Sequence, residues 1–182
     1  MLNIAYMTIT EVEGPGKRLA IWFQGCLKNC YGCCNPDMIP IKPANIINTG
    51  NLIDYITSLN NQIEGLTLLG GEPFLQAKNI VKVLEKIDKH LSIIAFSGYT
   101  FKELQNVKIE KAKELLSYLD VLIDGEYNHK IPEDKRRWIG SKNQKIYFFT
   151  DRYSIKDFDN KIDEIELHYK NGKIFINGFP IK

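Results

Sequence analysis

The chain has 182 residues, of which 44% are hydrophobic, and this is enough apolar material for one domain with a buried core. Its 24 Lys and Arg residues nearly balance its 22 Asp and Glu residues, and the net charge of +2 argues against nucleic acid as the main partner. No apolar run approaches the roughly 18 residues of a membrane helix, and the N-terminus lacks the order of a signal peptide. We therefore expect a cytoplasmic protein without a membrane partner.

Strand-like and helix-like segments alternate along the chain. Short apolar runs predict buried strands at residues 19–23, 66–69, 93–96, 121–123 and 146–149. Apolar side chains recur at helical spacing in residues 51–63, 76–91 and 109–119. This alternation predicts an α/β fold, in which a parallel sheet is covered by helices.

The chain is predicted to form a single domain over residues 1–182, with a core at about 14–150 and a C-terminal β-hairpin at about 162–178. The hairpin strands, residues 165–169 and 173–177, flank a Lys-Asn-Gly turn. Ligand sites in parallel sheets lie beyond the carboxyl ends of the strands. Those ends carry, in turn, the cysteines, GGEP, SGYT and DGEY, so we expect the site at this edge.

Four cysteines lie within the segment GCLKNCYGCCNP, at Cys26, Cys30, Cys33 and Cys34. In a reducing cytosol, clustered cysteines are typical of metal ligands or redox groups rather than of disulfides. A structural zinc site usually has two separated pairs of ligands, and adjacent Cys33 and Cys34 would bind one tetrahedral ion only with strain. A thioredoxin-like interpretation of Cys30-x-x-Cys33 leaves Cys26 unexplained.

An iron–sulfur cluster fits the spacing better, because Cys26, Cys30 and Cys33 supply three thiolates from one compact loop. A four-iron cluster normally takes four cysteines, so three would leave one iron open to another ligand. Cys34 is either a fourth ligand or a packed thiol beside the cluster. We favour the second interpretation, since its side chain is expected to point away from that of Cys33. The three histidines have no ligand-like spacing.

The chain resembles the radical S-adenosylmethionine (SAM) superfamily, and within it the branch of anaerobic ribonucleotide reductase activating enzyme and pyruvate formate-lyase activase. CxxxCxxC after a first strand is the superfamily signature, here within GPGKRLAIWFQGCLKNCYGCCNP. GGEPF, SGYTFKEL, DVLIDGEY and WIGSKNQ then follow in order, so that the resemblance covers about residues 14–149. Two residues depart from the pattern: the additional Cys34, and Glu126 where a basic or neutral residue is expected.

The resemblance implies an incomplete, TIM-like barrel of parallel strands with outer helices and a C-terminal hairpin. It implies a [4Fe–4S] cluster on Cys26, Cys30 and Cys33, with SAM bound at the open iron. Reductive cleavage of SAM would give methionine and a 5′-deoxyadenosyl radical that abstracts hydrogen. A low-potential flavodoxin or ferredoxin would then be the electron donor.

The resemblance also implies a set of SAM-binding residues, and no catalytic residue is assigned with certainty. This set comprises Tyr31, Gly70, Gly71, Glu72, Ser97, Tyr99 and Asp124. Structural roles stay open beside these: Glu72 as the shaper of a turn, Ser97 as a helix cap and Asp124 in an Asx turn. The basic residues at 130, 135–137 and 142 favour a solvated loop over docking to a partner or pairing with a carboxylate of the bound cofactor, and Arg18 is a similar case.

Three functions are weighed. The first is an activase that forms a glycyl radical on a glycyl radical enzyme, with anaerobic ribonucleotide reductase favoured. The second is a radical SAM enzyme that acts on a small molecule of the 7-deazapurine type or on a peptide. The third is a non-catalytic zinc or iron–sulfur module, and the GGEP and SGYT motifs at neighbouring strand ends argue against it.

Overall fold

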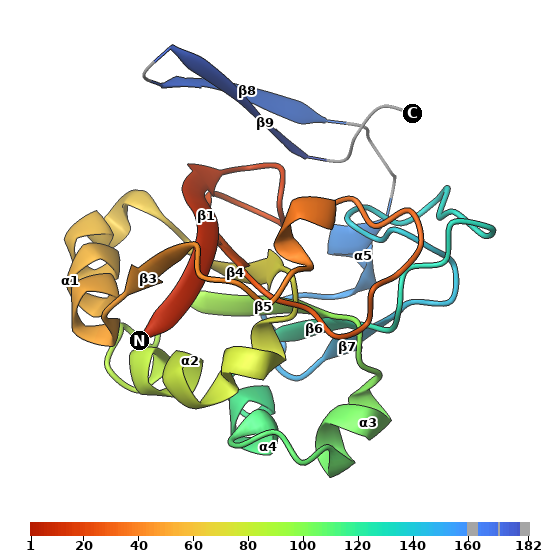
Figure 1. Ribbon diagram of the computed structural model, residues 1–182, viewed down its shortest axis with the longest axis horizontal. Helices are drawn as coiled ribbons and strands as arrows, with labels where there is room; N and C mark the ends of the chain where they lie inside the picture. The colour runs from red at the N-terminus through yellow and green to blue at the C-terminus, as the bar shows by residue number, and fades with distance from the viewer. Residues whose placement is uncertain (160–163, 171, 179–182) are drawn as a thin grey trace.

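The computed structural model describes residues 1–159, 164–170 and 172–178. A mixed sheet of seven strands, in the order β3-β1-β2-β4-β5-β6-β7, forms its body (Figure 1). The strands are β1 (Leu2–Thr10), β2 (Arg18–Phe23), β3 (Asn45–Ile47), β4 (Gly65–Gly70), β5 (Ser92–Ser97), β6 (Val121–Asp124) and β7 (Lys145–Phe148). Strands β2, β4, β5 and β6 pair in parallel, as the apolar runs predicted.

Helices cover one face of this sheet, where the larger part of the core lies (Figure 1). They are α1 (Thr49–Leu59), α2 (Ala77–Leu84), α3 (Phe101–Asn106) and α4 (Ala112–Leu116), while α5 (Ile155–Phe158) follows β7. Alternate side chains of the strands point to the two faces. Leu19, Ile21 and Phe23 of β2 pack under the helices, whereas Ala20 and Trp22 belong to a separate cluster on the opposite face. That opposite face carries the site.

The structure corrects the purely parallel sheet predicted from the sequence. β1 and β3 were not predicted, and β1 pairs antiparallel with both β2 and β3. β7 pairs antiparallel with β6, because residues 125–144 return as a loop with a Pro132–Ser141 bridge instead of as a crossover helix. The strand order establishes an open mixed sheet, and closure into a partial barrel stays a prediction.

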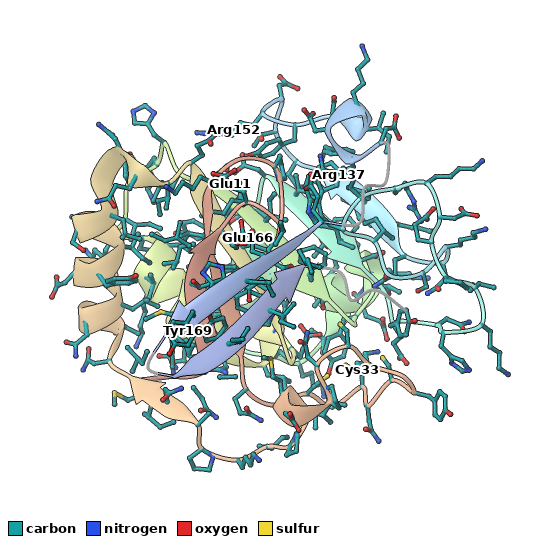
Figure 2. All side chains as sticks on the ribbon, turned by 90° about the horizontal axis from the view of Figure 1, so that it is seen from above. Glu11, Cys33, Arg137, Arg152, Glu166 and Tyr169 are labelled. Carbon is teal, nitrogen blue, oxygen red and sulfur yellow. The ribbon has the colours of Figure 1, made fainter. Side chains whose placement is uncertain are left out.

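The predicted hairpin is confirmed as β8 (Ile165–Lys170) and β9 (Lys173–Gly178), which form a two-stranded sheet of their own. It lies across the sheet on the side away from α2 and α4 (Figures 1 and 2). Hydrogen bonds to β1 and the segment after it fasten the hairpin, among them Glu11 N–H to Glu166 Oε1 at 2.8 Å and Gly178 N–H to Glu13 Oε1 at 3.0 Å. Residues 162, 163 and 171 of the predicted hairpin segment lie outside the described residues.

Arg18 is a buried structural residue, which corrects its assignment to a solvated or docking role. Its side chain is 0% exposed. It donates to Thr67 Oγ1 at 2.8 Å, to Leu66 O at 2.7 Å and to Ser92 O at 3.0 Å, and it also bonds to Tyr153 Oη at 3.0 Å. The guanidinium therefore joins β2, β4 and β5 at their amino ends, opposite the site. Within the described ranges, no helix is both long and apolar enough to cross a bilayer.

Candidate functional site

The cysteine loop begins where β2 ends, and backbone hydrogen bonds fix its first residues. Gly25 N–H donates to Met38 O at 2.8 Å, and Cys26 N–H donates to Ile39 O at 2.9 Å. On the other side, Glu72 N–H donates to Gly25 O at 2.8 Å. The loop is thus held between the returning segment at residues 38–39 and the end of β4, so that Cys26 has a defined position.

All four cysteines line one cavity of about 1550 Å³ on the face of the sheet opposite α1, α2 and α4. Backbone N–H groups point at two of the sulfurs: Lys28 N lies 3.4 Å from Cys26 Sγ, and Asn35 N lies 3.4 Å from Cys33 Sγ. Hydrogen bonds of this kind to thiolate sulfur are one of the levers by which proteins tune iron–sulfur sites.

The four thiols are not equivalent in acidity. Burial raises the pKa of the Cys26 and Cys30 thiols. A hydrogen bond from the Cys34 thiol lowers the pKa of Cys33 to about 6, and the same bond raises the pKa of Cys34. The Cys34 side chain therefore does not point away from that of Cys33, contrary to the expectation, and it favours the thiolate form of Cys33.

These residues fit an iron–sulfur cluster. Three thiols from one loop face the same cavity, and thiolate is the ligand that such clusters take. In the part of the chain that the structure describes, no group of three or more His, Cys, Asp or Glu is placed to hold a single metal ion. Cys26, Cys30 and Cys33 are the residues that would hold the cluster, with Cys34 hydrogen-bonded to the third of them.

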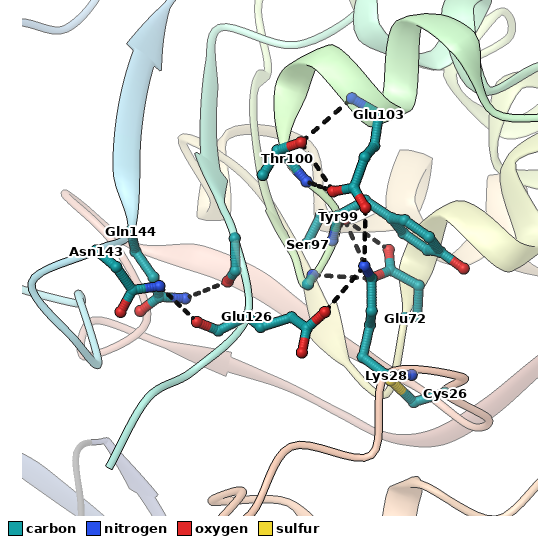
Figure 3. Close-up of polar contacts among 12 residues, drawn as sticks. Cys26, Lys28, Glu72, Ser97, Tyr99, Thr100, Glu103, Glu126, Asn143 and Gln144 are labelled. Carbon is teal, nitrogen blue, oxygen red and sulfur yellow. Dashed lines mark hydrogen bonds and ion pairs between the residues drawn. The ribbon is translucent and has the colours of Figure 1, made fainter. Parts of the chain in front are cut away.

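Glu72 joins the loops that follow β4 and β5. Its side chain is 0% exposed, and it accepts hydrogen bonds from Phe74 N at 3.1 Å and Gly98 N at 2.8 Å. It also accepts from Ser97 Oγ at 3.0 Å (Figure 3). Burial raises the pKa of Glu72 to about 7, although these hydrogen bonds act in the opposite direction. With its oxygens already engaged, this carboxyl group shapes the floor of the site.

Gly70 and Gly71 are required by close backbone packing. A Cβ on Gly70, which has φ +103°, would lie 2.6 Å from Phe23 N, and one on Gly71 would lie 2.4 Å from Gly25 O. No side chain is accommodated at such distances. Both glycines also line the cavity beside Ser97 and Gly98. The glycine pair therefore brings the end of β4 against the cysteine loop and leaves backbone facing the cavity.

Lys28, inside the cysteine motif, was not singled out from the sequence. Its Nζ lies 3.1 Å from Glu103 Oε1 and 3.1 Å from Glu126 Oε1, and 4.3 Å from the ring centroid of Tyr99 (Figure 3). Only 13% of the Lys28 side chain is exposed. The ammonium group thus links the cysteine loop to α3 and to the loop after β6. This explains the acidic residue at 126, because Glu126 pairs with a lysine of the loop.

A family model described as a 4Fe-4S single cluster domain matches residues 12–147. The anaerobic ribonucleoside-triphosphate reductase-activating protein of Enterobacteria phage T4 is 31% identical over 146 residues, which are 77% of this chain and 89% of that protein. The protein of the same name from Vibrio cholerae is 30% identical over 154 residues, or 80% of this chain and 96% of that one. The chain belongs to this family of activating proteins.

These matches confirm the prediction from the sequence motifs that the chain resembles the activating enzymes of anaerobic ribonucleotide reductase. Among solved structures, the similarity to QueE from Escherichia coli has a TM-score of 0.39 and 17% identity, and it covers 54% of this chain and 52% of that one.

The structure places the predicted SAM-binding residues at different depths. Gly70, Gly71 and Ser97 line the cavity together. Asp124 is 2% exposed and accepts from Phe101 N at 2.5 Å, so it connects β6 to the start of α3. Tyr31, in contrast, is 79% exposed, and its ring centroid lies 4.6 Å from that of His129.

The basic stretch is ordered around a buried carboxylate, which corrects its interpretation as a merely solvated loop. Glu133 accepts from Lys135 N at 2.9 Å and from Arg136 Nε at 2.6 Å. Burial raises the pKa of Glu133, but the hydrogen bonds from these donors have the larger combined effect and lower it to about 2. Lys130 and Lys142 line the cavity at this end.

Further cavity residues were missed by the sequence reasoning. Aromatic side chains form one wall, at Tyr6, Trp22, Phe96 and Trp138. Glu13 and Asn177 lie at the hairpin end, and both are nine-tenths or more buried. Trp22 and Phe96 belong to predicted strands, where a large apolar residue indicates only burial. No pattern in the sequence connects Glu13 with Asn177, since the docking of the hairpin brings both to the same cavity.

Proposed function

We propose that this activating-protein homologue is a radical SAM enzyme that forms a glycyl radical on an anaerobic ribonucleotide reductase. The observation that carries the proposal is the set of three cysteines on one loop, which face a large cavity at the carboxyl ends of parallel strands. The family model and the names of the relatives support the same conclusion.

The chemistry that a reduced [4Fe–4S] cluster supplies when bound is one-electron cleavage of SAM to methionine and a 5′-deoxyadenosyl radical, which takes a hydrogen atom from the substrate. The protein orients the reactants and excludes water. Cys26, Cys30 and Cys33 provide the thiolates. The backbone of Gly70 and Gly71, with Ser97 at the next strand end, provides polar groups for SAM.

The aromatic wall of the cavity shields the reaction from solvent. Lys28 keeps the cysteine loop against α3 and the loop after β6, and Glu72 keeps the two central strand-end loops together. Both side chains are committed to partners within the protein. We therefore assign them the positioning of the loops, on which the distance between cluster and SAM depends.

The reductase is proposed as the partner because the relatives are named for its activation. A flavodoxin or ferredoxin is proposed as the electron donor, since the cluster must be reduced at low potential. The test is electron paramagnetic resonance of the reductase from the same organism, incubated anaerobically with the reconstituted protein, SAM and a reductant. We expect a glycyl radical signal, and none with Cys30→Ala.

A protein that cleaves SAM in this assay but leaves the reductase without a radical would refute the assignment of the partner. The small-molecule alternative would then be the one to pursue. A protein that does not cleave SAM at all would refute the radical mechanism itself.

A further inference from the structure

Asn177, on β9, carries a buried side-chain amide. The side chain is 4% exposed and lines the cavity. Its Nδ2 makes no hydrogen bond to any residue that the structure describes. A buried donor that stays unpaired costs about 1–3 kcal/mol, and such groups are rare in native proteins. A donor of this kind in a cavity wall indicates a ligand that carries a hydrogen-bond acceptor.

The free edge of β9 lies beside this amide. Gly178 N–H is bonded to Glu13 Oε1 at 3.0 Å and therefore points away from β8. In antiparallel pairing, every second residue directs its N–H and C=O to the same edge. Ile176, two residues before Gly178, accordingly presents its backbone groups on the edge that faces Glu13. Residues 176–178 all line the cavity.

The position of this edge is fixed by the body of the protein. Trp138 Nε1 donates to Val12 O at 3.0 Å, which holds the segment before Glu13. Glu11 N–H donates to Glu166 Oε1, and Glu166 is the register partner of Asn177 across the hairpin (Figure 2). The amide of Asn177 is therefore held at the hairpin end of the cavity before any substrate arrives.

The cavity is large enough to hold a second ligand beside SAM. Its volume of about 1550 Å³ exceeds the roughly 300–1,000 Å³ that is typical for one small-molecule ligand. An extended polypeptide suits a free strand edge, because strand addition satisfies backbone groups on both sides. A polypeptide backbone also offers a carbonyl oxygen for an unpaired amide donor.

We propose that β9 and Asn177 bind the main chain of the polypeptide segment that receives the radical, with Asn177 Nδ2 donating to one of its backbone carbonyls. This rests on the proposed function, and it assigns Asn177 as a residue that positions the substrate. A small-molecule substrate has no main chain that could pair with the strand edge.

The probe is a fluorescent synthetic peptide that spans the radical-glycine segment of the reductase, measured by anisotropy with the reconstituted protein and SAM. Asn177→Asp keeps the shape of the side chain but replaces the donor with an acceptor. We expect it to weaken peptide binding roughly tenfold, the effect of one lost hydrogen bond. Asn106→Asp, the same change on the exposed end of α3, is the matched control and should bind as the wild type does.

A second series of peptides replaces one backbone amide at a time by an ester, whose carbonyl is a weaker acceptor. One position should weaken binding to the wild type and have no effect on Asn177→Ala. Thermal unfolding of each variant checks that the hairpin still docks.

Equal binding by the wild type and Asn177→Asp would overturn the inference, and so would a wild type that cleaves SAM but does not bind the peptide. Binding that depends on Asn177, in a wild type that yields no 5′-deoxyadenosine, would instead retain the peptide site and refute the proposed chemistry.

Discussion

Replacement of Glu13 by Gln is expected to remove a loss of folding stability that occurs in the wild type as the pH rises. Glu13 is 9% exposed. Burial raises its pKa from the ordinary 4.5 to about 7, against the hydrogen bond from Gly178 N–H, and the nearby Glu166 carboxylate adds to the rise. An acid with a higher pKa in the folded than in the unfolded state binds its proton preferentially when folded. Its contribution to stability is therefore fully present below pH 4.5 and is lost as the pH rises through 7.

The magnitude follows from these two pKa values. Their difference corresponds to about 3 kcal/mol of unfolding free energy once the pH is well above 7. Glu13→Gln carries no charge and keeps an oxygen that accepts from Gly178 N–H. Between about pH 5 and pH 8, the free energy of unfolding of the wild type should therefore fall by about 2–3 kcal/mol relative to that of this variant.

Urea unfolding of the reduced apoprotein at several pH values measures this difference. Glu11→Gln is the matched control, since Glu11 is an exposed carboxylate two residues away. If the free-energy difference between the wild type and Glu13→Gln stays constant over the range, the burial of an ionisable Glu13 beneath the hairpin is refuted.

Three further substitutions test other parts of the account, each by urea unfolding. Arg18→Met keeps the buried stem but leaves several acceptors on β4 and β5 unpaired, so we expect the free energy of unfolding to fall by at least about 3 kcal/mol. A fall of less than about 1 kcal/mol would contradict the role of Arg18 in joining the strands. Lys28→Met removes two ion pairs to half-exposed carboxylates and should cost about 1 kcal/mol at low salt and less at high salt; an effect independent of salt would argue against the pairing. Glu133→Gln should cost about 2 kcal/mol, because the charge-assisted bond to Arg136 is lost, and a neutral outcome would contradict the ordered loop.

The central strands could be predicted because they are buried on both faces. β2, β4, β5 and β6 are continuous apolar runs, and such runs stand out in a sequence. β1 is only partly buried and carries Asn3, Thr8 and Thr10 among its apolar residues, so its pattern is weaker. The antiparallel direction of β7 depends on a helix-free return loop, and a run of apolar residues does not contain that information.

The site was predictable where its residues are neighbours in sequence. Four cysteines on one loop and a glycine pair at a strand end are local signals. The pairing of Lys28 with Glu126, the engagement of Glu72 by Ser97 and Gly98, and the hydrogen bond from Gly178 to Glu13 join distant segments. Such contacts are set by the strand order and by the docking of the hairpin, and one sequence does not specify them.

The most direct test of the central claim is anaerobic reconstitution with iron and sulfide, followed by reduction in the presence of SAM and quantification of 5′-deoxyadenosine. The wild type is compared with Cys26→Ala, Cys30→Ala, Cys33→Ala and Cys34→Ala. We expect a four-iron cluster and 5′-deoxyadenosine in the wild type, their loss in the first three variants, and their retention in Cys34→Ala. A stable metal bound by all four thiolates, with no cleavage of SAM, would contradict the central claim.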